Sequence, residues 1–98
     1  MEEHMPTRSG YCIYIDTFFQ GPVPVERDED GNFVVYATEL EAQREIVEFA
    51  IDRLHQFLDG EREFGDAISV EDYIVRVDVL PDGSITDEHG RHFEKGDY

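Results

Sequence analysis

The sequence predicts an α+β fold in which a small antiparallel sheet is covered on one face by one long amphipathic helix. Three observations support this prediction. Residues 11–19 are rich in β-branched and aromatic side chains, apolar residues recur at helical spacing over 39–59, and apolar and polar residues alternate over 73–80. The expected element order is therefore β-β-α-β, with an optional fourth strand.

The length of 98 residues fits one domain. We assign residues 1–9 to a flexible N-terminal tail, 10–93 to a single α+β domain and 94–98 to a frayed C-terminus. No basic and apolar leader and no long apolar run is visible, so we expect neither a signal peptide nor a membrane span.

The first strand, residues 11–19, carries large apolar side chains on both faces, which is typical of a central strand. Pro22 and Pro24 follow it and are expected to break the sheet, because proline lacks the N–H that a ladder needs. After a turn rich in Asp and Gly, residues 32–37 read as a second strand. We expect this second strand to pair antiparallel with the first.

The helix has clear ends. Thr38 and Glu41 match a capping box at its start, and Gly60 is suited to the left-handed conformation that ends a helix. We assign it to 39–59. Its apolar residues span an arc of about 200°, which is wide for a helix on one small sheet. The arc predicts either deep burial or a second apolar contact, such as a dimer partner. The apolar positions are Leu40, Ile46, Val47, Ala50, Ile51, Leu54, Phe57 and Leu58.

The third strand, residues 73–80, alternates as a half-buried strand does. A turn at 81–84 leads into a short return strand at 84–86, and the residues from 91 onward are expected to be frayed or weakly paired. A right-handed crossover through the helix makes the second and third strands parallel. The order 2-1-3 then makes every neighbouring pair antiparallel and places the most apolar strand in the centre.

The composition is strongly acidic, with 24 carboxylates, 8 Lys and Arg residues and a formal net charge of −16. Direct binding to nucleic acid or to anionic lipid requires clustered Lys and Arg, so we expect this chain to bind neither directly. The single cysteine, Cys12, cannot form an intramolecular disulfide, which favours a reducing, cytoplasmic setting.

The sharpest feature is a carboxylate stripe on the helix, which we define as Glu41, Glu45, Glu48, Asp52 and Asp59. At about 100° per residue the five fall within roughly 60° of one another, opposite the apolar arc. Close like-charged pairs on a helix cost on the order of 1 kcal/mol together. The next segment continues the negative charge as far as residue 72. The predicted partner-binding residues are Glu41, Glu45, Glu48, Asp52, Asp59, Glu61, Glu63, Asp66, Glu71 and Asp72.

The first functional hypothesis is an acidic, non-enzymatic protein that occupies a basic surface of a partner. In size and charge alone, the chain resembles small phage-encoded inhibitors of nucleases, restriction enzymes and CRISPR effector complexes, which act as nucleic-acid mimics. The alternative is an accessory or structural domain, homodimeric through apolar helix residues such as Phe49 or Ala42, whose acidity serves solubility or salt adaptation.

The sequence contains three other candidate sites. Cys12 lies in an apolar strand and is interpreted as a buried structural thiol. His89 and His92, with Asp87 and Glu88, form a second alternative, a metal-binding turn. Asp28, Asp30 and Asn32 echo a calcium loop, but Phe33 takes the place of its glycine and Glu39, at its twelfth position, opens the helix. The chain also lacks a phosphate loop, a nucleophile elbow and a dinucleotide fingerprint, so we expect neither catalysis nor a cofactor.

Overall fold

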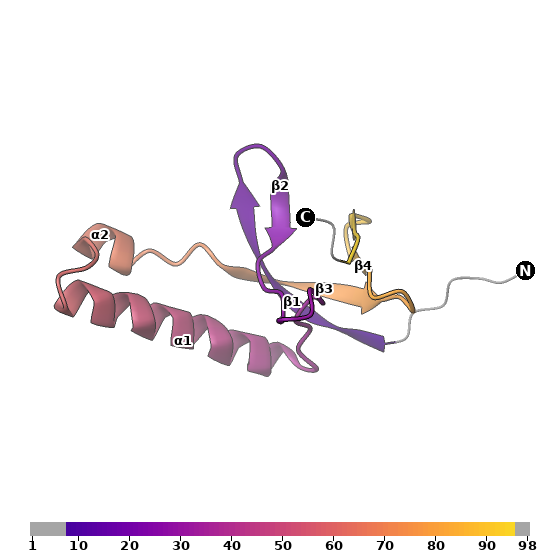
Figure 1. Cartoon of the computed structure of the whole chain (residues 1–98), viewed down its shortest axis with the longest axis horizontal. Helices are drawn as coiled ribbons and strands as arrows, with labels where there is room; N and C mark the ends of the chain where they lie inside the picture. The colour runs from indigo at the N-terminus through magenta and orange to yellow at the C-terminus, as the bar shows by residue number, and fades with distance from the viewer. Residues whose placement is uncertain (1–7, 96–98) are drawn as a thin grey trace, which may run out of the picture.

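The computed structural model describes residues 8–95 and has an α+β architecture with one main helix. All neighbouring strands in its curled five-stranded sheet are antiparallel, in the order β2-β1-β3-β4-β5 (Figure 1). The molecule is elongated, measuring 57 × 29 × 25 Å. The elements are β1 (Arg8–Thr17), β2 (Gly21–Pro24), α1 (Glu39–Leu58), α2 (Phe64–Ala67), β3 (Tyr73–Val79), β4 (Ile85–Asp87) and β5 (His92–Phe93).

The predicted strand order is wrong because the second strand lies elsewhere. It is β2, the proline-containing segment expected to break the sheet, whereas residues 32–37 contribute only isolated bridges. The Val25 N–H bonds the Ile13 carbonyl at 3.0 Å. Pro22 and Pro24 occupy the alternate positions, where a backbone N–H points away from β1. β2 is an edge strand, so its two missing donors remove no ladder bond.

The antiparallel pairing of the first strand with the third is confirmed, with Cys12 opposite Val75. The expected return strand is also present as β4, one residue later than predicted. Residues 92–93, expected to be weakly paired or frayed, instead form β5 at the other sheet edge. Arg8 and Ser9, assigned to the tail, belong to β1. Of the predicted C-terminus, Glu94 and Lys95 are described and exposed, outside any strand, whereas residues 1–7 and 96–98 lie outside the described residues.

The core lies on one face of the sheet. Cys12 and Tyr14 of β1 pack with Val75 and Val77 of β3 and with Phe33, which the loop after β2 brings over this face. The opposite face of β1 carries Ile13, which is also buried, and α1 packs against β1 and β3. The sheet is therefore covered by a loop on one side and by the start of the helix on the other.

The predicted helix is confirmed; it begins at Glu39 as expected and ends at Leu58, one residue before the predicted end. The Glu41 N–H donates to the Thr38 hydroxyl at 3.1 Å, and the Glu41 carboxylate accepts from the Ala37 N–H at 3.1 Å. Gly60 adopts a φ of 80° just beyond the C-cap. Within residues 8–95, no helix has the combination of length and apolarity that a bilayer crossing requires.

The expectation of deep helix burial is wrong. Of the twenty residues of α1, all of them described, only Ala42 is buried. Figure 1 shows the reason: α1 begins beneath the sheet, runs past its edge and ends at α2, so most of the helix has no sheet above it. We call residues 39–68 the helical arm.

Candidate protein-binding surface

The carboxylate stripe lies along α1 and starts at its capped end. Glu41 is held there by its hydrogen bond to the Ala37 N–H. Glu48 and Asp52 are exposed, Glu45 is half-buried, and Asp59 is the C-cap residue. The helix therefore presents a row of carboxylates, spaced by one turn over its first four members, from its cap towards the tip of the arm.

This row has no cationic counterpart within the described chain. Ion pairs between residues 8 and 95 involve Arg62, His89, Arg91 and His92, and no Lys, Arg or His nitrogen lies within 4.0 Å of a stripe carboxylate. Among the described residues, the stripe therefore carries its negative charge without a direct ion pair.

The remaining predicted site residues do not all share the face of the stripe. Asp66, Glu71 and Asp72 line a small pocket of about 110 Å³ together with Arg53. On a helical projection Arg53 lies about 100° from Asp52, on the side of α1 turned from the stripe. Asp66 also pairs with Arg62 at 2.6 Å. These carboxylates therefore face cations, and the stripe does not.

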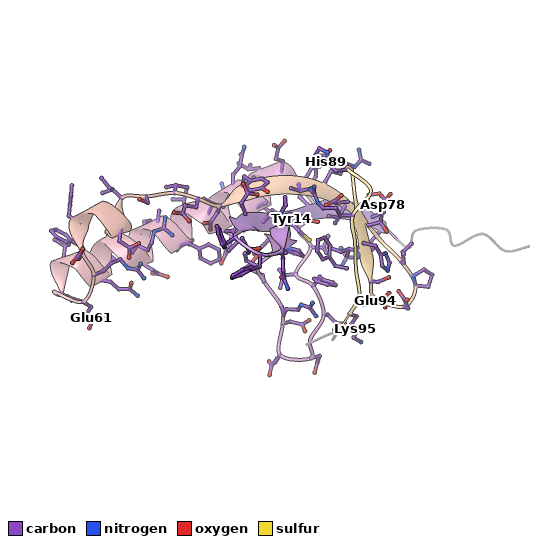
Figure 2. All side chains as sticks on the ribbon, turned by 90° about the horizontal axis from the view of Figure 1, so that it is seen from above. Tyr14, Glu61, Asp78, His89, Glu94 and Lys95 are labelled. Atoms are coloured by element: carbon purple, nitrogen blue, oxygen red, sulfur yellow. The ribbon has the colours of Figure 1, made fainter. Side chains whose placement is uncertain are left out.

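Arg53 is a feature that the sequence did not single out. Two of its guanidinium nitrogens, Nε and Nη2, are buried and have no hydrogen-bond partner among the described residues. Its pocket is lined by three carboxylates and by Ser69. Asp59, Glu61 and Glu63 lie further out, and Figure 2 shows Glu61 at the tip of the arm.

Glu26 is a further acidic residue that sequence reasoning missed. Burial raises its pKa most, and the charges of Glu45 and Asp72 raise it further, against the lowering effect of its hydrogen bond from the Tyr36 hydroxyl. The loop after β2 thus brings Glu26 within the influence of two predicted site residues that lie far apart in sequence. Nothing in the local acidic run 26–30 distinguishes Glu26 from its neighbours, so only the tertiary fold identifies it.

The two apolar residues named for a homodimer, Ala42 and Phe49, are not among the exposed residues of the helix. Ala42 is fully buried and Phe49 is half-buried, both turned towards the body of the molecule. The exposed apolar residues of α1 are instead Leu40, Val47, Ile51, Leu54, Phe57 and Leu58.

The predicted metal-binding turn does not form a ligand cluster. His89 lies 3.8 Å from Glu88, while His92 contacts Glu94 and Thr86, each at 3.1 Å. Across the described part of the chain, no three His, Cys, Asp or Glu side chains come together as a metal site would need. Residues 28–32 form a turn in which the Asp28 carboxylate accepts the N–H groups of Asp30 and Asn32.

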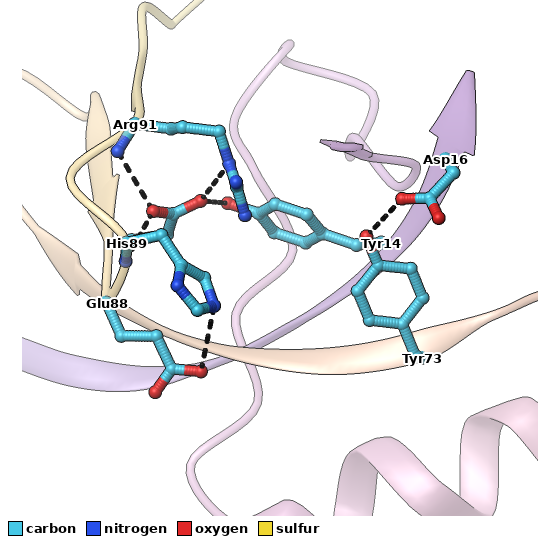
Figure 3. Close-up of polar contacts among 7 residues, drawn as sticks. Tyr14, Asp16, Tyr73, Glu88, His89 and Arg91 are labelled. Carbon is cyan, nitrogen blue, oxygen red and sulfur yellow. Dashed lines mark hydrogen bonds and ion pairs between the residues drawn. The ribbon is translucent and has the colours of Figure 1, made fainter. Parts of the chain in front are cut away.

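Asp87 belongs to a structural network rather than to a metal site. Its carboxylate accepts hydrogen bonds from the Tyr14 hydroxyl at 3.0 Å and from Arg91 Nε at 2.9 Å, and from the backbone N–H groups of His89 and Arg91 (Figure 3). Burial acts to raise its pKa, but these bonds and the Arg91 charge outweigh burial, and the pKa is lowered. The network ties β1 to the β4–β5 turn.

Cys12 is buried, and its thiol lies 3.4 Å from the Val34 carbonyl. Burial raises its pKa to about 12, with a smaller contribution from Glu26. A thiolate at neutral pH is therefore disfavoured, as a structural role requires.

Comparison with known proteins gives no relative for this chain. No family description matches the sequence, and neither a curated protein nor a solved structure is significantly similar to it.

Proposed function

We propose that this protein is a small acidic, non-enzymatic binding protein that lays the carboxylate stripe of α1 on a basic surface of a partner. The partner class that fits is a DNA- or RNA-binding protein or a defence nuclease, which the stripe would inhibit as a nucleic-acid mimic. The observation that carries the proposal is a row of carboxylates on an exposed helix that forms no ion pair with a cation of the described chain.

The spacing of the row supports this partner class. Stripe carboxylates three and four residues apart rise about 4.5–6 Å along the helix axis. The phosphates of one nucleic-acid strand are spaced by about 3.4 Å. A basic groove that binds a phosphate backbone can therefore meet the stripe with a comparable density of charge. Because exposed like charges repel within the free helix, a cationic partner also removes a local cost.

Charge reversal of the stripe tests the proposal. Glu45→Lys, Glu48→Lys and Asp52→Lys are combined, and Glu41 is kept because it caps the helix. The matched control combines Glu29→Lys, Asp30→Lys and Glu94→Lys, three exposed acidic residues outside the arm. Both variants change the net charge equally. We expect the wild type and the control, immobilised at low salt, to retain nucleic-acid-binding proteins from a host lysate, and the stripe variant to lose them.

Salt dependence completes this test. Contacts between the stripe and a basic groove should weaken steeply as NaCl is raised, because screening removes long-range attraction between exposed charges. The salt-adaptation alternative predicts instead that the two charge-reversed variants behave alike. Equal retention by both variants, or retention of no basic protein by the wild type, would contradict the proposal.

A further inference from the structure

The solvent face of α1 carries a heptad seam. Six positions follow one another in steps of 4, 3, 4, 3 and 4 residues, and all six side chains are exposed. Five are apolar, with exposed fractions between 41 and 74%. The seam consists of Leu40, Arg44, Val47, Ile51, Leu54 and Leu58.

This spacing is the a/d pattern by which two helices pack together. A lone surface helix turns its apolar stripe towards the core of its own domain. In α1 that inward role belongs to a different set of residues, which includes Ala42 and the half-buried Phe49. The helix therefore has two apolar faces, and the described chain covers only one of them.

The seam exposes a strip of apolar surface along one face of α1. Taking about 150 Å² for each fully exposed residue, its five apolar members present roughly 400 Å². Each partner in a standard interface buries about 800 Å², of which a little more than half is apolar. The seam therefore supplies most of the apolar area that a dimer of ordinary size needs.

The seam is complementary to itself when one copy is reversed. An antiparallel second copy places Leu40 opposite its Leu58, and Val47 opposite its Ile51, around a two-fold axis near residue 49. Arg44 then faces Leu54 of the second copy and can extend past it to solvent. A parallel copy would instead place Arg44 against its own equivalent, a like-charged pair inside the seam.

The shape of the molecule fits the same arrangement. The sheet lies at the N-terminal end of α1, and the arm projects beyond it (Figure 1). An antiparallel pairing puts the two sheets at opposite ends of the helix pair, about 27 Å apart along the axis for an 18-residue seam. A parallel pairing would bring both sheets to the same end.

We propose that α1 pairs antiparallel with α1 of a second copy through this seam. The two-fold axis then runs perpendicular to the plane of the helix pair, so the same edge of each helix faces the same side. Glu41 and Glu48 lie next to the seam on that edge, and Glu45 and Asp52 lie just beyond them. The dimer thus joins two stripes into one broad acidic surface. The use of this surface to bind a partner rests on the proposed function, whereas the helix pairing is argued from the seam alone.

Sedimentation equilibrium over a range of protein and NaCl concentrations tests the pairing. We expect a dimer whose Kd falls as salt rises, because screening relieves repulsion between two strongly acidic chains. Ile51→Lys should raise the Kd by more than about 100-fold, because it buries one unpaired ammonium group against Val47 on each side of the two-fold axis. Phe19→Lys, which alters a 91% exposed residue in the β1–β2 turn, is the control and should leave the Kd unchanged. Arg44→Leu should lower the Kd.

Disulfide trapping tests the orientation. Leu40→Cys and Leu58→Cys proteins are mixed and oxidised, while Cys12, 1% exposed, remains protected. An antiparallel pair gives the mixed 40–58 disulfide, and a parallel pair gives 40–40 and 58–58 disulfides. A monomer at all concentrations, an unchanged dimer in Ile51→Lys or a parallel disulfide pattern would overturn the proposal. Salt separates this failure from failure of the proposed function, because salt strengthens the dimer and weakens binding to a basic partner.

Discussion

The sheet end and the helical arm of this molecule are built on opposite principles. At the sheet end, a cluster of buried side chains from β1, β3 and β4 packs under Phe33, and a buried carboxylate holds the strands together. In the arm, α1 buries one side chain out of twenty and leaves a row of carboxylates and a row of apolar residues in solvent.

This difference assigns the two regions different tasks. Burial of apolar area is the main favourable term in folding, so the stability of the monomer must come from the sheet end. The arm contributes little to the stability of the monomer. It exposes instead two kinds of surface through which proteins associate, a row of like charges and an apolar seam. Substitutions should therefore act on stability at one end and on binding at the other.

The largest expected effect on stability is at Asp87. Asp87→Ala removes the acceptor of hydrogen bonds from the Tyr14 hydroxyl, the Arg91 guanidinium and two backbone N–H groups, and it leaves these donors without their partner. Loss of one partner from such a buried charged network costs about 3–5 kcal/mol. Urea unfolding followed by circular dichroism measures the loss.

Asp82→Ala is the matched control, because Asp82 also accepts a backbone N–H and a side-chain hydroxyl in a turn but is exposed. It should cost about 1 kcal/mol. Equal losses in the two variants would show that burial of the Asp87 network does not dominate stability at the sheet end.

Acid should remove part of the same stability. The pKa of Asp87 in the folded chain is lowered below the ordinary value of 3.8. Its contribution is therefore fully present above that value and is lost as the pH falls through the lower folded pKa. Urea unfolding between about pH 5 and 2 should show a decline that is shallower in Asp87→Ala. Parallel declines in the two proteins would rule out this role for Asp87.

Local signals in the sequence predicted the helix and its two ends correctly. The cap at Thr38 and the stop at Gly60 depend on neighbouring residues alone, and both occur as expected. The pairing of β1 with β3 was also predictable, because an apolar strand needs neighbours on both sides. The position of the second strand was predicted wrongly. Pro22 and Pro24 lie in the one register in which a strand tolerates them, and this register is set by the tertiary fold.

The candidate site was predictable only in part, for a similar reason. Helical periodicity placed the stripe carboxylates on one edge of α1, but it could not say which part of a 200° apolar arc the sheet would cover. Tyr14 and Asp87 are 73 residues apart, and the loop after β2 brings Glu26 within the influence of the charges of Glu45 and Asp72. These contacts are set by the fold, and no short-range spacing encodes them.

A smaller effect is expected at the junction of the two regions. Thr38→Ala removes the hydroxyl that accepts the Glu41 N–H and should cost about 1 kcal/mol, whereas Thr38→Ser should restore most of it. The free energy of unfolding from urea titration measures both variants. Because α1 packs on the sheet only near its start, this cap should matter more to stability than any exposed residue nearer the tip. A loss no larger than that of Leu58→Ala would contradict the division between sheet end and arm.

The smallest expected effect on stability is at the stripe itself. It distinguishes repulsion between stripe carboxylates from an acidity that serves the whole surface. Glu48 lies three residues after Glu45 and four before Asp52, so Glu48→Gln removes two like-charged contacts and should stabilise the protein by a few tenths of a kcal/mol at low salt. The gain should vanish in molar NaCl, where screening acts within about 3 Å. Glu29→Gln, in the exposed loop after β2, has no such helical neighbours and should gain less. Thermal unfolding of both variants at low and high salt measures the difference. Stabilisation by Glu48→Gln alone means that carboxylates of the free arm repel one another and that a basic partner can relieve this repulsion. Equal stabilisation by both substitutions favours an acidity that serves the whole surface.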